Sequence, residues 1–396
     1  MQEVTAQDNK PKVNDRARAA IKVLIALAIG AAVLAVYMLG FKGDSAAQCD
    51  FISYWAAGQL LVHGQNPYDA KAVRALELHE GLDPSALTLV MRNPPLALPI
   101  AWPLGRIGSK AGVIAWTFFL IAALILVSRL LWMMNGRHDS LLNLLGFGFP
   151  PVVACLMARQ TGILLLLGIT LFLFLRKDRP FFAGASLWLC ALKPHYFVPF
   201  GIALFLWCLT NKKGYRILAG FGVVLAGSCA LAYAMDPHAW AQYAELIRTG
   251  GPLNEIVPSW SAQLRLVTNP HAVWIQFLLE AGACVFAVWY FWTRRQDWDW
   301  MDHGLVLLLV GAIAAPYGFV YDESMLLPAI LAGAFLCVKT RRPLWPLGVL
   351  IVTGLLELEF GAEIISRAYL WTTPAWLGWY VYATGRFSRR RLLAPP

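Results

Sequence analysis

The stretch AGVIAWTFFLIAALILV, residues 111–127, contains no charged side chain. Extended by a few residues, a helix of this kind crosses the ~30 Å hydrocarbon core of a bilayer. Residues 21–41 have the same character, with Lys22 as the one charged residue. The whole chain is 59% hydrophobic and 14% charged, whereas a soluble protein has about 25% charged residues. These features predict an all-α polytopic membrane protein, and they exclude a soluble domain, a disordered chain and a disulfide scaffold.

Further apolar segments recur along the chain, and some are short enough to be tilted, re-entrant or broken. We therefore expect a bundle of about 10–12 transmembrane helices within residues 21–385. The segments are 21–41, 111–134, 140–157, 161–175, 180–192, 195–210, 216–235, 271–292, 303–319, 323–338, 344–360 and 367–385. The first run is too long for a signal peptide and has no cleavage site, so we interpret it as a permanent span. Residues 1–20 are predicted to be a disordered cytoplasmic N-terminus, and residues 386–396 a cytoplasmic basic tail.

The distribution of Lys and Arg predicts the orientation, because these residues collect on the cytoplasmic side of short loops. With the N-terminus inside, the inner segments hold 22 of the 33 cations and 8 of the 23 acids. Both termini are then cytoplasmic, in a plasma (bacterial inner) membrane. Two long loops, about 43–110 and 236–270, fall on the extracytoplasmic side. The net charge of +10 is thus explained by orientation, and we expect membrane lipids and no nucleic acid as partners.

The seven cysteines have no paired spacing, which predicts neither a disulfide framework nor a cysteine metal site. Asp50 and the Asp322-Glu323 pair are too few and too far apart in sequence to argue for a metal site. We expect an activity that needs no metal and no cofactor.

The first outer loop begins with DFISYWAAGQLLVHGQNPYD, residues 50–69. The apolar spacing over residues 51–62 predicts a short helix packed flat on the membrane surface, with Asp50 as its N-cap. Gly64 stands where a helix should stop, and residues 66–69 are typical of a turn. Asp50 is open to two interpretations: it caps the helix, or it takes a proton from a hydroxyl at the water–lipid boundary.

Four further motifs follow this loop in order along the chain. They are Arg92-Asn93-Pro94-Pro95-Leu96, Arg159-Gln160-Thr161-Gly162, a glycine-containing segment from residue 183 that ends in Lys193-Pro194-His195, and Ala315-Pro316-Tyr317-Gly318 with Tyr321-Asp322. Together with the first loop they resemble the signature of glycosyltransferase family 87, the DUF2029 family, in the GT-C superfamily. The family includes polyprenol-phosphate-mannose-dependent mannosyltransferases. The chain departs from the pattern where Arg159 and Gly162 replace the more usual Gly and Asn, and where Tyr317-Gly318 replaces the His of some relatives.

The resemblance implies a GT-C-like membrane glycosyltransferase. It would move a hexose, mannose by default, from a polyprenyl-phosphate-linked sugar donor to a glycolipid or glycan acceptor on the extracytoplasmic side, with inversion. Asp50 would be the general base, and cations would stabilise the phosphate leaving group. The candidate phosphate ligands are Lys193, Arg159 and Arg92. The candidate sugar or acceptor ligands are Tyr54, Trp55, Asn93, Gln160, His195, Tyr317, Tyr321 and Asp322.

Other interpretations remain open at this point. Lys193 could snorkel to the interface, Asp322 could cap a helix, and Tyr54 could belong to an aromatic belt. The whole protein could be a transporter or flippase of lipid-linked sugars, or a noncatalytic scaffold. A transporter needs charges along a central path, whereas the expected spans here contain few, so the sequence favours an enzyme.

Overall fold

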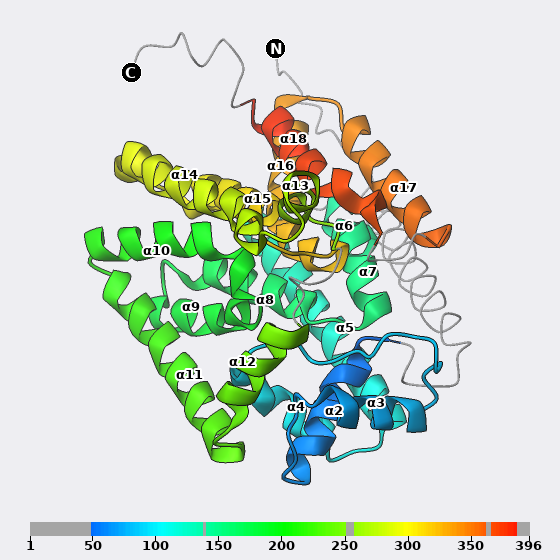
Figure 1. Ribbon diagram of the computed structural model, residues 1–396. Helices are drawn as coiled ribbons and strands as arrows, with labels where there is room; N and C mark the ends of the chain where they lie inside the picture. The colour runs from blue at the N-terminus through cyan, green and yellow to red at the C-terminus, as the bar shows by residue number, and fades with distance from the viewer. Residues whose placement is uncertain (1–48, 138–139, 251–256, 362–365, 386–396) are drawn as a thin grey trace, which may run out of the picture. The chain divides into compact units, whose positions relative to one another are not determined.

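Figure 1 shows a computed structural model of the protein, which describes residues 49–137, 140–250, 257–361 and 366–385. Every regular element in these ranges is a helix, and they contain no β-strand. The expected all-α class is therefore confirmed. The first expected span, residues 21–41, lies outside the described residues, as do the two terminal segments 1–20 and 386–396.

Four helical stretches of the described residues are long and apolar enough to cross a membrane. A fifth is possible if a pair bent by 43° counts as one span. The four stretches are Ser109–Met134, Gly214–Met235, Val273–Asp297 and Val320–Thr340, and the bent pair is Leu141–Gly148 with Pro150–Ala158. The expected segments 161–175, 180–192, 195–210 and 303–319 contain shorter apolar helices. The expected segments 344–360 and 367–385 contain helices Trp345–Glu359 and Thr372–Thr384.

The helices before residue 200 belong to the first loop and the first half of the bundle. They are α2 (Phe51–Val62), α3 (Ala70–His79), η3 (Pro95–Ala97), α4 (Leu98–Leu104), α5 (Ser109–Met134), η4 (Leu141–Leu144), α6 (Leu145–Gly148), α7 (Pro150–Ala158), α8 (Gly162–Leu175), α9 (Pro180–Ser186), η5 (Leu187–Leu192), η6 (Pro194–Tyr196) and α10 (Val198–Thr210).

The second half of the chain continues with long and short helices. They are α11 (Gly214–Met235), α12 (Ala239–Gly250), α13 (Trp260–Thr268), η8 (Val273–Phe277), α14 (Leu278–Arg294), η9 (Arg295–Asp297), η10 (Trp300–Gly304), α15 (Leu305–Ala314), η11 (Val320–Leu326), α16 (Leu327–Thr340), α17 (Trp345–Glu359), η12 (Arg367–Trp371) and α18 (Thr372–Thr384).

Helix α2 begins directly after Asp50, as expected, and ends before Gly64, which has a φ of +67°. It is not the surface helix that the sequence predicts, because all of its residues except Gln59 and Val62 are buried. Its partner is α4, which lies against it in Figure 1. A Cβ on Gly58 would come within 2.1 Å of the Ala101 carbonyl oxygen. The glycine therefore allows the two backbones to touch and draws α2 into the protein.

The same use of small residues joins α9 to α11, which lie side by side in Figure 1. A Cβ on Gly184 would meet the Ile217 carbonyl oxygen at 1.9 Å, and one on Gly220 would meet the Phe181 carbonyl oxygen at 1.9 Å. Close contact between small residues is a common way to associate helices in a membrane, where the hydrophobic effect does not drive them together.

Large apolar side chains on the outer faces of the long helices remain exposed, among them Phe118 on α5, Val223 on α11 and Val285 on α14. Exposed apolar surface of this extent is typical of contact with lipid tails. The chain is therefore an integral membrane protein.

Candidate functional site

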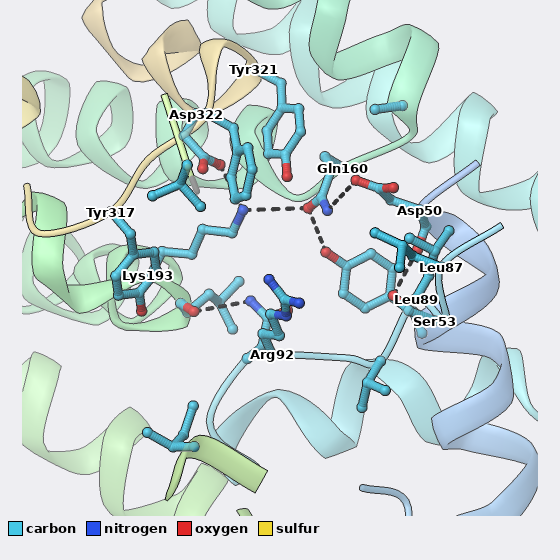
Figure 2. Close-up of a pocket in the computed structure, with 18 of the residues that line it drawn as sticks. Asp50, Ser53, Leu87, Leu89, Arg92, Gln160, Lys193, Tyr317, Tyr321 and Asp322 are labelled. Carbon is cyan, nitrogen blue, oxygen red and sulfur yellow. Dashed lines mark hydrogen bonds and ion pairs between the residues drawn. The ribbon is translucent and has the colours of Figure 1, made fainter. Parts of the chain in front are cut away.

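A cavity of about 1560 Å³ lies where the connections between helices meet. Its wall includes residues from the first loop, from α12, and from the short connections before α8, after η5 and after α15. The charge distribution predicts the same outer side for all of these segments. Figure 2 shows Asp50, Ser53, Leu87 and Leu89 on one side of the cavity. Lys193, Tyr317 and Asp322 lie on the other side, with Gln160 and Arg92 between the two groups.

Asp50 is held in the wall by its backbone and faces the cavity with its carboxylate. Its N–H donates to the Ala158 carbonyl oxygen at 3.1 Å, which ties the start of α2 to the end of α7. Asp50 occupies the N-cap position, but its side chain makes no capping hydrogen bond among the described residues. Instead Oδ2 accepts a hydrogen bond of 2.7 Å from Gln160 Nε2. The capping interpretation of the side chain is therefore wrong, and the carboxylate is directed into the site.

Gln160 is the centre of the hydrogen-bond network. Its Oε1 accepts from the Tyr54 hydroxyl at 2.6 Å, from the Thr161 N–H at 3.2 Å and from Lys193 Nζ at 3.4 Å. Its Nε2 donates to Asp50. One amide thus connects the carboxylate on one side of the cavity to the ammonium group on the other.

Lys193 forms an ion pair with Asp322, with 2.6 Å between Nζ and Oδ1. The second carboxylate oxygen of Asp322 accepts from the Tyr196 hydroxyl at 3.0 Å. Lys193 Nζ also lies 4.9 Å from the centre of the Tyr321 ring, in a cation–π contact. Asp322 is 1% exposed, so its charge depends on these partners. Lys193 therefore points into the protein and does not snorkel.

The turn that presents Gln160 depends on its neighbours in the Arg159-Gln160-Thr161-Gly162 motif. Helix α7 ends at Ala158, and its C-cap residue Arg159 has a left-handed φ of +54°. A Cβ on Gly162 would lie 2.5 Å from the Tyr321 carbonyl oxygen and 2.8 Å from Ser324 Oγ. The departure from the family pattern at position 162 thus has a steric reason, because only glycine lets η11 pack this closely against the start of α8.

Gly318 has a comparable role in the late motif. A Cβ there would come within 2.5 Å of the Tyr196 hydroxyl oxygen. That hydroxyl donates to Asp322 and accepts from the Phe319 N–H at 3.1 Å. The glycine therefore leaves room for the tyrosine that orients Asp322.

His195 lies in the cavity wall between two aromatic rings, with ring centroids 3.9 Å from Tyr317 and 4.4 Å from Tyr196. In the described part of the chain neither of its ring nitrogens has a hydrogen-bond partner. Burial and the charge of Lys193 hold the pKa of His195 well below its usual value. The ring is therefore neutral at pH 7 and offers one donor and one acceptor.

Arg92 and Asn93 bring the first loop to the floor of the cavity. Asn93 Nδ2 donates to the Leu192 carbonyl oxygen at 2.9 Å, which holds the loop next to Lys193. Tyr243 on α12 donates to the Arg92 carbonyl oxygen at 3.4 Å. The Arg92 side chain points toward Gln160 and Lys193 in Figure 2, which places a second cation in the site.

Not all of the predicted residues reach the cavity. Trp55 is buried between α2 and the segment after α4, where its Nε1 donates to the Ile107 carbonyl oxygen at 2.9 Å. Arg159 is not part of the cavity wall, and its carbonyl oxygen accepts from Trp116 Nε1 at 2.8 Å. Glu323, next to Asp322 in the chain, is also absent from the cavity wall, and its carboxylate accepts from Thr372 and Trp376 of α18.

The remaining predicted residues do line the cavity. They are Asp50, Tyr54, Arg92, Asn93, Gln160, Lys193, His195, Tyr317, Tyr321 and Asp322. The sequence interpretation missed Tyr196, which adjoins the Lys-Pro-His motif, and the loop of residues 81–90, which carries no motif. The only sequence signal for Tyr196 is its position directly after the motif, and the loop of residues 81–90 has no sequence signal.

Burial raises the pKa of the Asp50 carboxyl above its ordinary value. The hydrogen bond from Gln160 and the charges of Lys193 and Arg92 act in the opposite direction, whereas Asp322 adds to the increase. Across the described residues, no group of three or more His, Cys, Asp or Glu side chains is arranged to hold a metal ion.

The helical fold and the lined cavity define an integral membrane protein that encloses a polar site between its helix connections. The sequence profile of glycosyltransferase family 87 matches residues 92–316, more than half of the chain. The protein belongs to glycosyltransferase family 87, and membership of that family implies transferase activity on a sugar donor and an acceptor. Neither a curated protein nor a solved structure matches the chain.

Proposed function

We propose that this protein transfers a hexose, mannose by default, from a polyprenyl-phosphate sugar to a glycolipid or glycan acceptor on the extracytoplasmic side. The observation that carries the proposal is the presence of a carboxylate and two cations, Asp50, Lys193 and Arg92, in the wall of one large cavity. A carboxylate suits a general base, and cations suit a phosphate leaving group.

The proposed reaction is a single displacement. The acceptor hydroxyl oxygen forms a bond to the anomeric carbon as its proton passes to Asp50. The bond from the anomeric carbon to the phosphate oxygen breaks, and its electron pair stays on the lipid phosphate. Asp50 Oδ2 is occupied by Gln160, and no described residue donates to Oδ1. Oδ1 is therefore the oxygen we assign to the acceptor proton.

The two sides of the cavity suit two substrates. We assign the acceptor to the side of Asp50, Leu87 and Leu89, and the donor to the side of Lys193, His195 and Tyr317. A neutral histidine whose two buried nitrogens have no hydrogen-bond partner among the described residues suits sugar hydroxyls, and Tyr317 offers a ring face beside it. Arg92 lies between the sides, where it can reach the phosphate.

The test compares the wild-type protein with Asp50→Asn, using purified full-length protein, labelled polyprenyl-phosphate mannose and a membrane glycolipid extract. Asparagine keeps the shape of the side chain but cannot take the proton, so we expect transfer to fall by about 10²- to 10⁴-fold. The thermal unfolding temperature should stay within a few degrees. Near-normal turnover by the variant would exclude Asp50 as the base.

The same assay separates an enzyme from a flippase. An enzyme forms a new glycosidic bond, which mass spectrometry of the lipid extract detects. A flippase moves labelled donor across a vesicle membrane and leaves it chemically unchanged. Mass spectrometry of glycolipids and glycans from cells with and without the protein then names the sugar and the acceptor.

A further inference from the structure

The amide oxygen of Gln160 has little capacity left to accept a hydrogen bond from a substrate. Three donors converge on Oε1: the Tyr54 hydroxyl, the Thr161 N–H and Lys193 Nζ. A carbonyl oxygen has two lone pairs, so a sugar hydroxyl would have to displace one of these donors. Oε1 is therefore a poor acceptor for a sugar or acceptor hydroxyl, and the amide keeps one Nε2 proton besides the one given to Asp50.

The same contacts determine which way the amide faces. A flipped amide would present its NH₂ group to Tyr54, the Thr161 N–H and Lys193, and the last two can only donate. It would also present its oxygen to the Asp50 carboxylate, which can only accept. The NH₂ group must therefore face Asp50, in agreement with the 2.7 Å hydrogen bond from Gln160 Nε2 to Asp50 Oδ2.

We propose that Gln160 is a positioning residue, which holds Asp50 Oδ2 and stabilises the charged form of the carboxylate so that Oδ1 can act as the base. This inference rests on the proposed function of Asp50. A hydrogen bond from a neutral amide to a carboxylate favours the ionised state. Desolvation of the buried Asp50 carboxyl favours its protonated state. The hydrogen bond from Gln160 acts against this effect and therefore helps to set the fraction of Asp50 that is deprotonated near pH 7.

The titration of Asp50 also depends on the other charged and titratable groups around it. These are Lys193 and Asp322 across the cavity, Arg92 between the two sides, Cys49 next to Asp50 in the chain, and Tyr54 and Tyr321 from α2 and η11. Burial raises the pKa values of Tyr54 and Cys49, so both are neutral near pH 7. A variant of Gln160 leaves all of these groups in place, so a change in the titration reports the lost hydrogen bond.

The sign of the expected effect follows from the role of a base. Asp50 is active when deprotonated, so transfer rises as the pH increases through its pKa. Loss of the Gln160 hydrogen bond removes stabilisation of the charged form and raises that pKa. The acid limb of the pH–rate profile should therefore move to higher pH, by about one to two pH units.

The test uses Gln160→Met, which keeps the length of the side chain but donates nothing, in purified full-length protein with polyprenyl-phosphate mannose and the glycolipid extract. Infrared difference spectra over pH, assigned by subtraction of Asp50→Asn spectra, give the midpoint of the carboxyl band without any turnover. We expect the infrared midpoint and the acid limb of the pH–rate profile both to move to higher pH. At pH 7 kcat should fall about tenfold or more, and it should recover at alkaline pH. KM for the donor should change less than about threefold.

Tyr54→Phe is the second variant, because it removes one of the three donors to Oε1 and leaves the Gln160 side chain in place. We expect a smaller rise of the same midpoint. Thr170→Val on α8 is the matched control, since its buried hydroxyl has no partner among the described residues and lies outside the network. It should leave the midpoint, the pH profile and KM unchanged.

An unchanged infrared midpoint in both Gln160→Met and Tyr54→Phe would overturn the inference. An increase in KM for the donor or acceptor with an unchanged midpoint would identify Gln160 as a ligand, which also overturns it. If the infrared midpoint rises but the acid limb of the pH–rate profile does not move, the effect of Gln160 on Asp50 is supported. The assignment of Asp50 as the general base in the proposed function is then wrong.

Discussion

Lys193 shares its ammonium protons between Asp322 and Gln160, at 2.6 and 3.4 Å. An ammonium group has three protons, so one remains for a ligand in the cavity. The partner carboxylate is almost fully buried, which makes the pair sensitive to the loss of either member, because a buried charge without its partner is costly. The same residue therefore serves the stability of the site and, in our proposal, the binding of the donor phosphate.

We expect Lys193→Ala to lower the free energy of unfolding by about 3–5 kcal/mol, because Asp322 then stands unpaired. The double variant Lys193→Ala with Asp322→Asn removes both charges and should recover most of that stability. If Lys193 binds phosphate, the double variant should still show KM for the donor raised by about tenfold or more. Lys71→Ala, which changes an exposed lysine that is not part of the cavity wall, serves as the control. Wild-type KM in the double variant would contradict the phosphate role.

At the scale of the helices, the position of Asp50 depends on how α2 packs. Gln59 Nε2 donates to the Gly105 carbonyl oxygen at 2.6 Å, and Trp55 donates to Ile107. Gly58 and Gly105 face one another, and a Cβ on either would overlap the other helix. These contacts act on one side of α2, while the Asp50 N–H ties the start of the helix to the Ala158 carbonyl oxygen at the end of α7.

Gly58→Ala should force α2 and α4 apart, because the new Cβ would lie 2.1 Å from the Ala101 carbonyl oxygen. Overpacking of this kind costs about 1–3 kcal/mol, and we expect a lower unfolding temperature together with slower transfer as Asp50 moves. Gly222→Ala on α11 is the matched control, since a Cβ there meets nothing within 4 Å. Thermal unfolding and the transfer assay measure both variants. If the two variants have the same unfolding temperature and the same transfer rate, the close contact between α2 and α4 at Gly58 is not present.

At the scale of the whole molecule, several helices stop where the cavity begins. Helix α8 starts directly after Gln160 and Thr161, η5 ends before Lys193, and α15 ends before the late motif. In a membrane, backbone without regular hydrogen bonds is tolerated where it lines a polar cavity. Short helices are thus expected beside a site built from interrupted spans, and this fits the four or five helices of the described residues that are long enough to cross a bilayer alone.

The predicted orientation has a direct test. We expect Lys71→Cys, in the first loop, to react with a membrane-impermeant maleimide added to intact cells, and Lys213→Cys, between α10 and α11, to react only after the cells are opened. Both lysines are exposed, and the unmodified protein serves as the background for its own cysteines. Reaction at position 213 in intact cells, with none at 71, would reverse the topology and place the cavity on the cytoplasmic side.

The sequence by itself determined the class of the protein, because long apolar runs and sparse charge leave a membrane helix as the stable state. It also determined the family, through motifs whose order along the chain is enough for recognition. The tertiary structure decided how those motifs combine. Asp50, Gln160, Lys193 and Asp322 lie far apart in sequence, and their hydrogen bonds depend on turns, glycine contacts and backbone ties that no local pattern encodes. It also decided that Trp55 and Arg159 stand outside the cavity wall and that α2 is buried, because these outcomes depend on which helices pack against which.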